Sequence, residues 1–250
     1  MTLLAVDGLA KSYGGVRAVA GVSFSLAEGE FLALIGPNGA GKTTCFNMLN
    51  GQIRPDAGSV RFGSREITGL RPRQIWRLGV GRTFQVAQSY ASMTVSENVQ
   101  LALIAYRRRL FSFVPRAAAL YRDDATVLLE RVGMAAQADR PCGVLAYGDL
   151  KRLELAVALA NSPRLLLMDE PTAGMAAGER LSLMALAVSL APARGISMLF
   201  TEHDMDVVFG HAERIIVMNR GRIIADGVPS VVRSDPQVRE VYLGADTAAA

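Results

Sequence analysis

The sequence predicts an α/β domain with a mostly parallel sheet flanked by helices, an antiparallel β subdomain and an inserted helical subdomain. Three observations support this fold class. After Leu145, apolar strand-like segments alternate with helix-like segments, which is typical of a parallel sheet covered by helices. Residues 1–62 are instead rich in strand-like segments separated by glycines and charged turns. Residues 94–140 change to helical periodicity.

The individual elements follow from apolar runs and from start and stop residues. In the first part we expect strands at 3–6, 22–26, 31–35, 59–62 and 80–84. Ser96 is expected to cap a helix from Glu97 to Tyr106, and a second helix is expected over 119–132. Further on we expect strands at 165–168, 196–200, 215–218 and 223–225, a helix ending at Leu190 and a short helix before Ile215.

Length and composition limit the class of protein. The chain has 250 residues, of which 50% are hydrophobic and 20% charged, so it can bury a large core and is neither disordered nor collagen-like. We expect one domain over residues 1–245, with the helical subdomain at about 90–160 and a flexible tail at 246–250. We find no secretory signal and no membrane-spanning run, which predicts a cytoplasmic chain. Cys45 and Cys142 are isolated, as in a reducing compartment.

A phosphate-binding loop follows the expected strand 31–35. The segment fits the pattern GxxxxGK[ST] between an apolar strand and a helix. Its glycines allow backbone N–H groups to approach phosphates, Lys42 offsets phosphate charge, and Thr43 offers a hydroxyl to magnesium. The expected nucleotide-binding residues are Gly36, Pro37, Asn38, Gly39, Ala40, Gly41, Lys42, Thr43 and Thr44.

Two carboxylates end the apolar run 165–168. The carboxyl edge of a parallel sheet is where ligands bind, so Asp169 and Glu170 are expected to point toward the nucleotide. Asp169 is expected to hold Mg²⁺ directly or through water, and Glu170 to orient and deprotonate the attacking water. The alternative is an exposed acidic turn after a strand.

Three further candidates are weaker when taken alone. Gln85 follows an expected strand and is placed to reach Mg²⁺ and the attacking water, but a solvated loop glutamine is the alternative. His203 follows another strand and is placed to contact the γ-phosphate, with a solvated or helix-capping histidine as the alternative. Tyr13 is a candidate for stacking on adenine, although tyrosines near strand ends often only pack.

Taken together, and in the order in which they follow along the chain, these motifs resemble those of the nucleotide-binding domain of ABC transporters. The resemblance covers nearly the whole chain. The segment Leu145–Arg152 looks like the signature loop of that family, followed by a helix at 153–160. The resemblance implies that two such domains face head to tail and share each ATP site. It assigns the contact with the partner's γ-phosphate to Ala146, Tyr147, Gly148 and Asp149, with His203 as the switch histidine.

Finer features resemble the larger ATPase of branched-chain amino acid importers. They are the segment 202–205, the ending around 227–229, 235–236 and 242–244, and the long helical segment around 106–122. The resemblance implies ATP and Mg²⁺ as cofactors and a peripheral location on the cytoplasmic face of the inner membrane. It implies membrane permease subunits and a second ATP-binding subunit as partners, with a periplasmic or extracellular substrate-binding protein acting indirectly.

Three positions depart from the family pattern. Ala146 stands where a serine usually donates to the partner's phosphate, Asp149 replaces a glutamine, and Ala176 replaces an Asp or Asn expected at the dimer interface. We expect the two alanines to weaken contacts between chains and not contacts within one chain.

Other function classes are less well supported. Arg107 and the next two arginines lie among aromatic residues, which would suit nucleic acid, but the patch is short and a solvated, membrane-proximal face explains it better. A soluble ABC-type ATPase acting on nucleic acid or ribosomes remains the alternative function. A regulatory subunit that binds but does not hydrolyse ATP is disfavoured by the presence of Lys42, Glu170 and His203.

Overall fold

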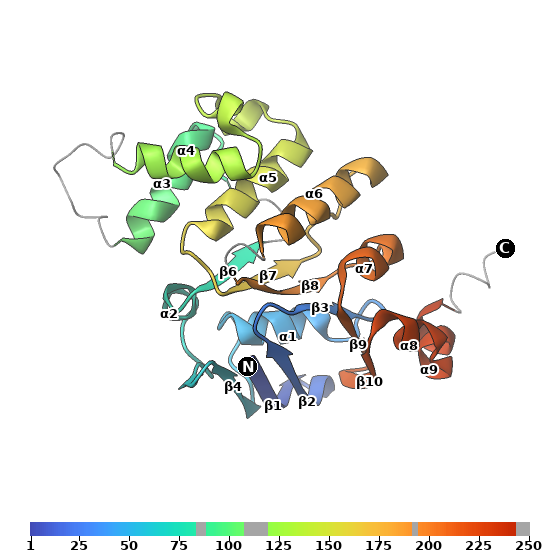
Figure 1. The fold of residues 1–250 in the computed structure, drawn as a ribbon. Helices are drawn as coiled ribbons and strands as arrows, with labels where there is room; N and C mark the ends of the chain where they lie inside the picture. Colours follow the sequence, from blue (N-terminus) through green and yellow to red (C-terminus); the bar gives the residue numbers. More distant parts are fainter. Residues whose placement is uncertain (84–88, 108–119, 192–194, 244–250) are drawn as a thin grey trace.

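The computed structural model describes residues 1–83, 89–107, 120–191 and 195–243. Within these ranges the strands form two sheets (Figure 1). The antiparallel sheet has the order β2-β1-β4-β5, and the six-stranded sheet has the order β10-β9-β3-β8-β7-β6. The strands are β1 (Thr2–Tyr13), β2 (Val16–Ala27), β3 (Phe31–Ile35), β4 (Ala57–Phe62), β5 (Arg65–Glu66), β6 (Val80–Thr83), β7 (Leu165–Asp169), β8 (Ser197–Thr201), β9 (Arg214–Asn219) and β10 (Arg222–Gly227).

The six-stranded sheet is parallel from β9 to β6, as predicted, and only β10 runs antiparallel, paired with β9. The side chains of β3 show how this sheet separates two hydrophobic cores. Phe31, Ala33 and Ile35 belong to one buried cluster, whereas Leu32 and Leu34 belong to the other. This alternation follows from the period of two along a strand and explains why the whole strand is buried.

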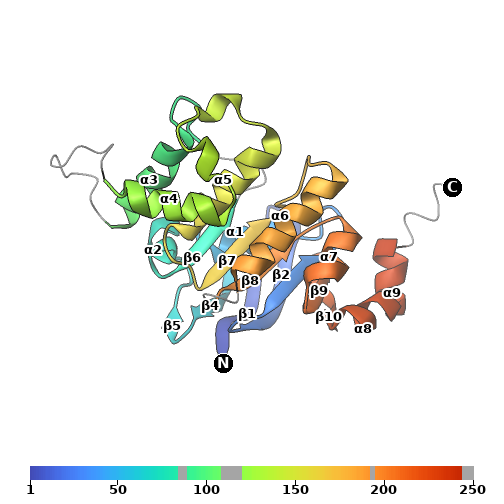
Figure 2. The ribbon, with the colours of Figure 1, turned by 45° about the horizontal axis from the view of Figure 1, so that its top comes forward.

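Helices cover both faces of this sheet. The α-helices are α1 (Lys42–Leu49), α2 (Pro72–Arg77), α3 (Val95–Tyr106), α4 (Arg122–Arg131), α5 (Tyr147–Leu159), α6 (Ala177–Leu190), α7 (Met205–His211), α8 (Pro229–Ser234) and α9 (Pro236–Val238). Two short 3-10 helices, η2 (Ala135–Gln137) and η3 (Cys142–Val144), and a short π-helix, η5 (Arg239–Leu243), complete the described helical segments. Helix α1 lies between the two sheets, and α3, α4 and α5 gather beyond the opposite face of the six-stranded sheet (Figures 1 and 2). The division into subdomains stays a prediction.

The first two strands are much longer than expected. Each has twelve residues, and β1 continues through Gly8, where its pairing with β2 shifts register between Val6 and Leu9. Gly8 has φ 58°, so it supplies a bulge inside the strand and not a turn after it. As a result β1 ends at Tyr13, which lies near the first residues of α1.

Three helix boundaries correct the sequence prediction. Ser96 does not cap α3, because Thr94 does: its Oγ1 accepts from Glu97 N–H while Glu97 Oε2 accepts from Thr94 N–H. The second helix begins at Arg122, later than expected, since Tyr121 at its N-cap has φ 59°. Helix α5 begins at Tyr147, so part of the expected signature loop is its first turn.

Both cysteines are free and buried, as expected of isolated thiols. Burial raises the pKa of the Cys45 thiol to about 12. None of the helices within the described ranges combines the length and the apolar character that crossing a bilayer requires.

Candidate nucleotide-binding site

The loop between β3 and α1 is pressed against neighbouring backbone. Gly36 has φ 149° and Gly41 has φ 102°, conformations that favour glycine. A Cβ at Gly36 would collide with the carbonyl oxygen of Met218, and one at Gly41 with that of Ala18. The loop therefore takes its shape only with glycine at both positions, and it delivers its N–H groups to the start of α1.

Lys42 is buried beneath this loop. Its ammonium donates to the carbonyl oxygens of Gly36 at 2.7 Å and Pro37 at 3.2 Å. Burial lowers the pKa of Lys42, while the charges of Glu170 and Asp169 act in the opposite direction. The side chain is thus an ammonium group held on the loop with two carboxylates nearby, an arrangement that can offset phosphate charge.

A cavity of about 340 Å³ opens over the loop. It is lined by Tyr13, Ala18, residues 38–44 and Glu170. The Tyr13 side chain, 48% exposed, presents its ring there, with Lys11 Nζ 5.8 Å from the ring centroid. The structure therefore brings together the phosphate loop, a candidate stacking ring and a candidate base, which lie far apart in the sequence.

Asp169 ends β7 with both carboxylate oxygens occupied. Oδ1 accepts from Thr201 Oγ1 at 2.9 Å, and Oδ2 accepts from Arg82 Nη2 at 3.4 Å. Thr201 ends β8, which pairs in parallel with β7, so the two residues lie side by side at the carboxyl edge. Asp169 is buried, and these two contacts compensate its charge.

Glu170 is held in an unusual backbone conformation. Its φ is 48°, in the left-handed region that non-glycine residues rarely adopt. The backbone N–H of Glu170 donates to Thr201 Oγ1 at 3.0 Å, and its Oε1 lies 2.9 Å from His203 Nε2. The carboxylate is aimed into the cavity over the loop and is paired with the expected histidine. Such a carboxylate–imidazole pair can position and deprotonate a water molecule.

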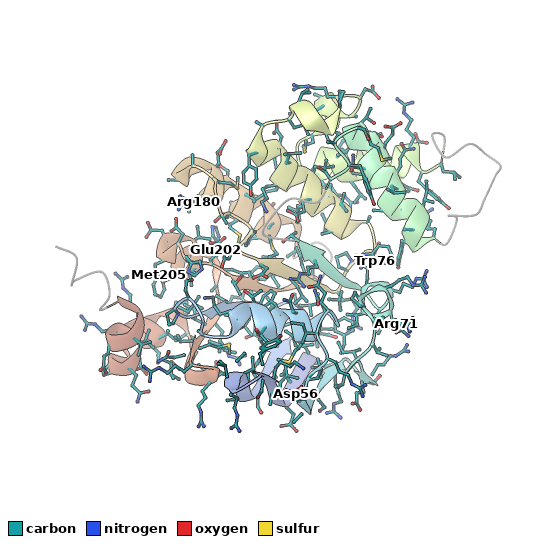
Figure 3. The ribbon with its side chains drawn as sticks, turned by 180° about the vertical axis from the view of Figure 1, so that it is seen from behind. Asp56, Arg71, Trp76, Arg180, Glu202 and Met205 are labelled. Atoms are coloured by element: carbon teal, nitrogen blue, oxygen red, sulfur yellow. The ribbon has the colours of Figure 1, made fainter. Side chains whose placement is uncertain are left out.

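Two polar links join the loop after β7 and the helix that follows it, α6, to the loop after β8. Thr172 donates from its N–H and its hydroxyl to Glu202 Oε1, at 2.9 and 2.7 Å, and all of these groups are buried. Arg180 on α6 forms a 2.8 Å ion pair with Asp204, whose side chain caps α7. Figure 3 shows Arg180 and Met205 on these neighbouring helices, with Glu202 close by. These links hold the loop that carries His203 beside Glu170.

The expected signature residues lie in a different place. Ala146, Gly148 and Asp149 line a separate cavity of about 290 Å³ together with Glu179 and other residues of α6. Tyr147 is 39% exposed, and its ring approaches Gly174 in the loop after Asp169. The structure of one chain does not bring these residues to the cavity over the phosphate loop.

Some predicted residues cannot be placed. Gln85, the two arginines after Arg107 and the tail 246–250 lie outside the described residues. Other residues at the site were not predicted: Thr201 contacts both Asp169 and Glu170, and Arg82 contacts Asp169. The sequence holds a signal for each, because a threonine directly follows the apolar run 196–200 and an arginine interrupts the run 80–84.

Comparison with known proteins agrees with this geometry. Residues 19–173 match the family described as ABC transporter. The chain belongs to this family. Residues 222–248 also match the family described as branched-chain amino acid ATP-binding cassette transporter.

Individual ABC relatives cover nearly the whole chain. One relative is the high-affinity branched-chain amino acid transport ATP-binding protein LivG of Salmonella typhimurium. The two sequences are 42% identical over 97% of this chain and 98% of LivG. It is 38% identical, with the same coverage, to the protein BraF of Pseudomonas aeruginosa, which carries the same description.

Solved structures agree on the ABC fold. A nucleotide-free ATP-binding cassette from an ABC transporter matches with a TM-score of 0.86 and 32% identity, covering 97% of this chain and 99% of that one. An ATP-binding cassette in its ADP conformation matches with a TM-score of 0.87 and 34% identity, covering 98% and 99%. The predicted fold class and ABC membership are confirmed, and the chain is an ATP-binding ATPase of the ABC transport type. The soluble alternative is not favoured.

Proposed function

We propose that this chain hydrolyses ATP on the cytoplasmic face of the cell membrane to power import of branched-chain amino acids or related small polar substrates. ATP hydrolysis is supported by one cavity, which is lined by the loop 38–44, Tyr13 and Glu170, the last of these paired with His203. The substrate rests on the names of the relatives, which are branched-chain amino acid transport proteins.

Within the site, the loop N–H groups and Lys42 bind the phosphates, and Tyr13 stacks on the base. Glu170 removes a proton from the attacking water, and His203 holds the carboxylate and reaches the γ-phosphate. Thr43 offers a hydroxyl oxygen and Asp169 a carboxylate oxygen. Together with the phosphate oxygens of the nucleotide, these are ligands of the kind that Mg²⁺ prefers. When bound, Mg²⁺ neutralises charge on the phosphate oxygens. Gln85 remains our candidate for a further ligand.

The separate signature cavity supports a dimer. Residues 146–149 lie away from the loop cavity of their own chain, so a second ATP-binding subunit facing head to tail is needed for them to reach a γ-phosphate. The partner in this proposal is a second copy or a paralogue, and both sit beneath membrane permease subunits. A substrate-binding protein outside the membrane acts through the permease.

Uptake in proteoliposomes tests the proposal. The chain is reconstituted with the permease subunits and the substrate-binding protein with which it is proposed to assemble, and entry of radiolabelled leucine is followed. We expect uptake that requires ATP on the side of this chain. ATP-dependent uptake of an unrelated solute with no competition by leucine would reject the proposed substrate class.

We predict that Tyr13→Ala weakens ATP and GTP binding alike. Stacking on a base contributes about 1–3 kcal/mol and does not read the base edge, so both affinities should fall by about five- to 150-fold. Titration with fluorescent nucleotides measures this. Tyr90→Ala removes another exposed tyrosine, outside this cavity, and should leave both affinities unchanged. Unaltered affinity in Tyr13→Ala would mean that the ring only packs.

We predict that Ala146→Ser acts in two ways. Ala146 is the N-cap of α5 and has no side-chain oxygen that could accept a hydrogen bond from the N–H groups of the first turn. A serine there should stabilise the isolated chain by about 1 kcal/mol, raising its melting temperature. In the assembled transporter its hydroxyl should also strengthen closure of the dimer, since hydrogen bonds to charged groups contribute about 1.5–3 kcal/mol.

Thermal melting of the isolated chain and ATPase assays of the complex separate the two effects. Nucleotide affinity of the isolated chain should not change, because the signature cavity is separate from the loop cavity. A change in that affinity would contradict a role across the dimer interface.

A further inference from the structure

A buried arginine contacts the carboxylate that we assign to Mg²⁺. Arg82 lies on β6, and its Nη2 donates to Asp169 Oδ2 at 3.4 Å. The side chains are only 11% and 8% exposed, so little solvent screens their charges. This arginine therefore acts on any cation that binds Asp169.

Arg82 is also held by groups other than Asp169. Nη2 donates to Asn47 Oδ1 at 3.0 Å, and Nη1 donates to Gln52 Oε1 at 3.0 Å. Asn47 belongs to α1, the helix that begins at the phosphate loop, and Gln52 follows that helix. The guanidinium group is thus held by two amide oxygens, one on the phosphate-loop helix and one just after it, and its position does not depend on Asp169 alone.

Two cationic side chains act on the carboxylates that we assign to the metal and the attacking water. Lys42 faces the two carboxylates Asp169 and Glu170, and Arg82 faces Asp169. Glu154 also acts on Arg82, but it forms a 3.3 Å ion pair with Lys151 on the same helix. Without a nucleotide, a divalent cation meets two carboxylates already compensated by two cationic side chains. Phosphate oxygens add the negative charge that changes this balance.

We propose that Arg82 is a positioning residue that holds Asp169 in the absence of metal and weakens divalent-cation binding, so that the cation binds only together with a nucleotide. The proposal rests on the metal-binding role of Asp169 in the proposed function. Even at near-aqueous screening, removing a unit charge about 6 Å from a divalent ion corresponds to about tenfold in affinity, so tenfold is the smallest effect expected for this buried pair.

Arg82→Gln is the principal variant, and two readouts are independent of turnover. Binding of Mn²⁺ alone, followed by the electron paramagnetic resonance signal of free Mn²⁺, should be at least about tenfold tighter in Arg82→Gln than in the natural protein. The ratio of fluorescent-ADP dissociation constants in EDTA and in Mg²⁺ should rise by a similar factor. Unchanged or weaker Mn²⁺ binding, or an unchanged ratio, would overturn the proposal.

Further variants separate charge from structure. Arg82→Lys keeps the charge and should keep the Mg²⁺ ratio within about twofold, whereas equal behaviour of Arg82→Lys and Arg82→Gln would show a purely structural role and overturn the proposal. Arg65→Gln removes an exposed arginine on β5 and should change nothing. If Arg82→Gln does not fold, Gln52→Glu serves instead. It keeps the shape, adds a carboxylate beside Nη1, and should tighten Mn²⁺ binding about threefold; no tightening overturns the proposal.

Asp169→Asn distinguishes this proposal from the function on which it rests. It should reduce the difference between the ADP dissociation constants in EDTA and in Mg²⁺, although Thr43 and the phosphate oxygens remain. If that difference is undiminished in Asp169→Asn, Asp169 does not hold the metal, and both its assignment in the proposed function and the role of Arg82 fail. If it shrinks while Arg82→Gln behaves as the natural protein does, only the role of Arg82 fails.

Discussion

Replacing Lys42 with alanine is expected to weaken ATP binding about a hundredfold or more, because charge-assisted hydrogen bonds to phosphate contribute about 1.5–3 kcal/mol each. The ammonium already lies on the loop, bonded to the carbonyl oxygens of Gly36 and Pro37, so no rearrangement of the chain is needed to present it. Without it, the phosphates would meet Asp169 and Glu170 with less compensation. Equilibrium titration with a fluorescent ATP analogue measures the loss.

Two controls make the Lys42 experiment specific. Lys42→Met keeps much of the side-chain volume and should lose affinity as Lys42→Ala does, since charge and not packing is responsible. Arg61→Ala removes an exposed positive charge on β4 and should bind ATP normally. Near-normal affinity in Lys42→Ala would mean that the loop does not bind the terminal phosphates.

Replacing Glu170 with glutamine is expected to leave ATP affinity within about twofold while lowering turnover by about 10²–10⁴, the contribution typical of a general base. The amide has the same shape and can still contact His203, whose Nε2 lies 2.9 Å from Glu170 Oε1. It cannot accept a proton from water. Binding and phosphate release, measured on the same preparation, should therefore separate.

Asp206→Asn is the matched control for Glu170→Gln. Asp206 is an exposed acid in the first turn of α7, close to His203 in the sequence, and its loss should leave turnover unchanged. Full turnover in Glu170→Gln would contradict its assignment as the base. A parallel loss of binding and turnover would instead indicate that Glu170 is needed to maintain the cavity.

Much of the site follows from contiguous sequence. The phosphate loop can be predicted because a single segment carries the glycines, Lys42 and Thr43 between a strand and a helix. Asp169 and Glu170 can be predicted because a buried parallel strand must end at the ligand-binding edge. How these residues come to share one cavity with Tyr13 could not be predicted from the sequence. That arrangement depends on the fold, because β1 is three times as long as the expected segment 3–6 and carries Tyr13 at its end.

The remaining features depend on contacts between distant segments. Thr201 and Arg82 are conspicuous in their strands, but only the parallel pairing of β6, β7 and β8 brings them to Asp169. The left-handed backbone at Glu170 has no local glycine signal and depends on the hydrogen bond from its N–H to Thr201. Thr94 could have been recognised as the cap of α3, since Glu97 stands three residues later.

The most direct test of the central claim is the ATPase activity of the assembled transporter in liposomes. We expect phosphate release to rise when the substrate-binding protein is loaded with leucine, and to stay at background when the chain carries Glu170→Gln. Activity that leucine does not alter, or that nucleic acid or ribosomes stimulate instead, would contradict the account.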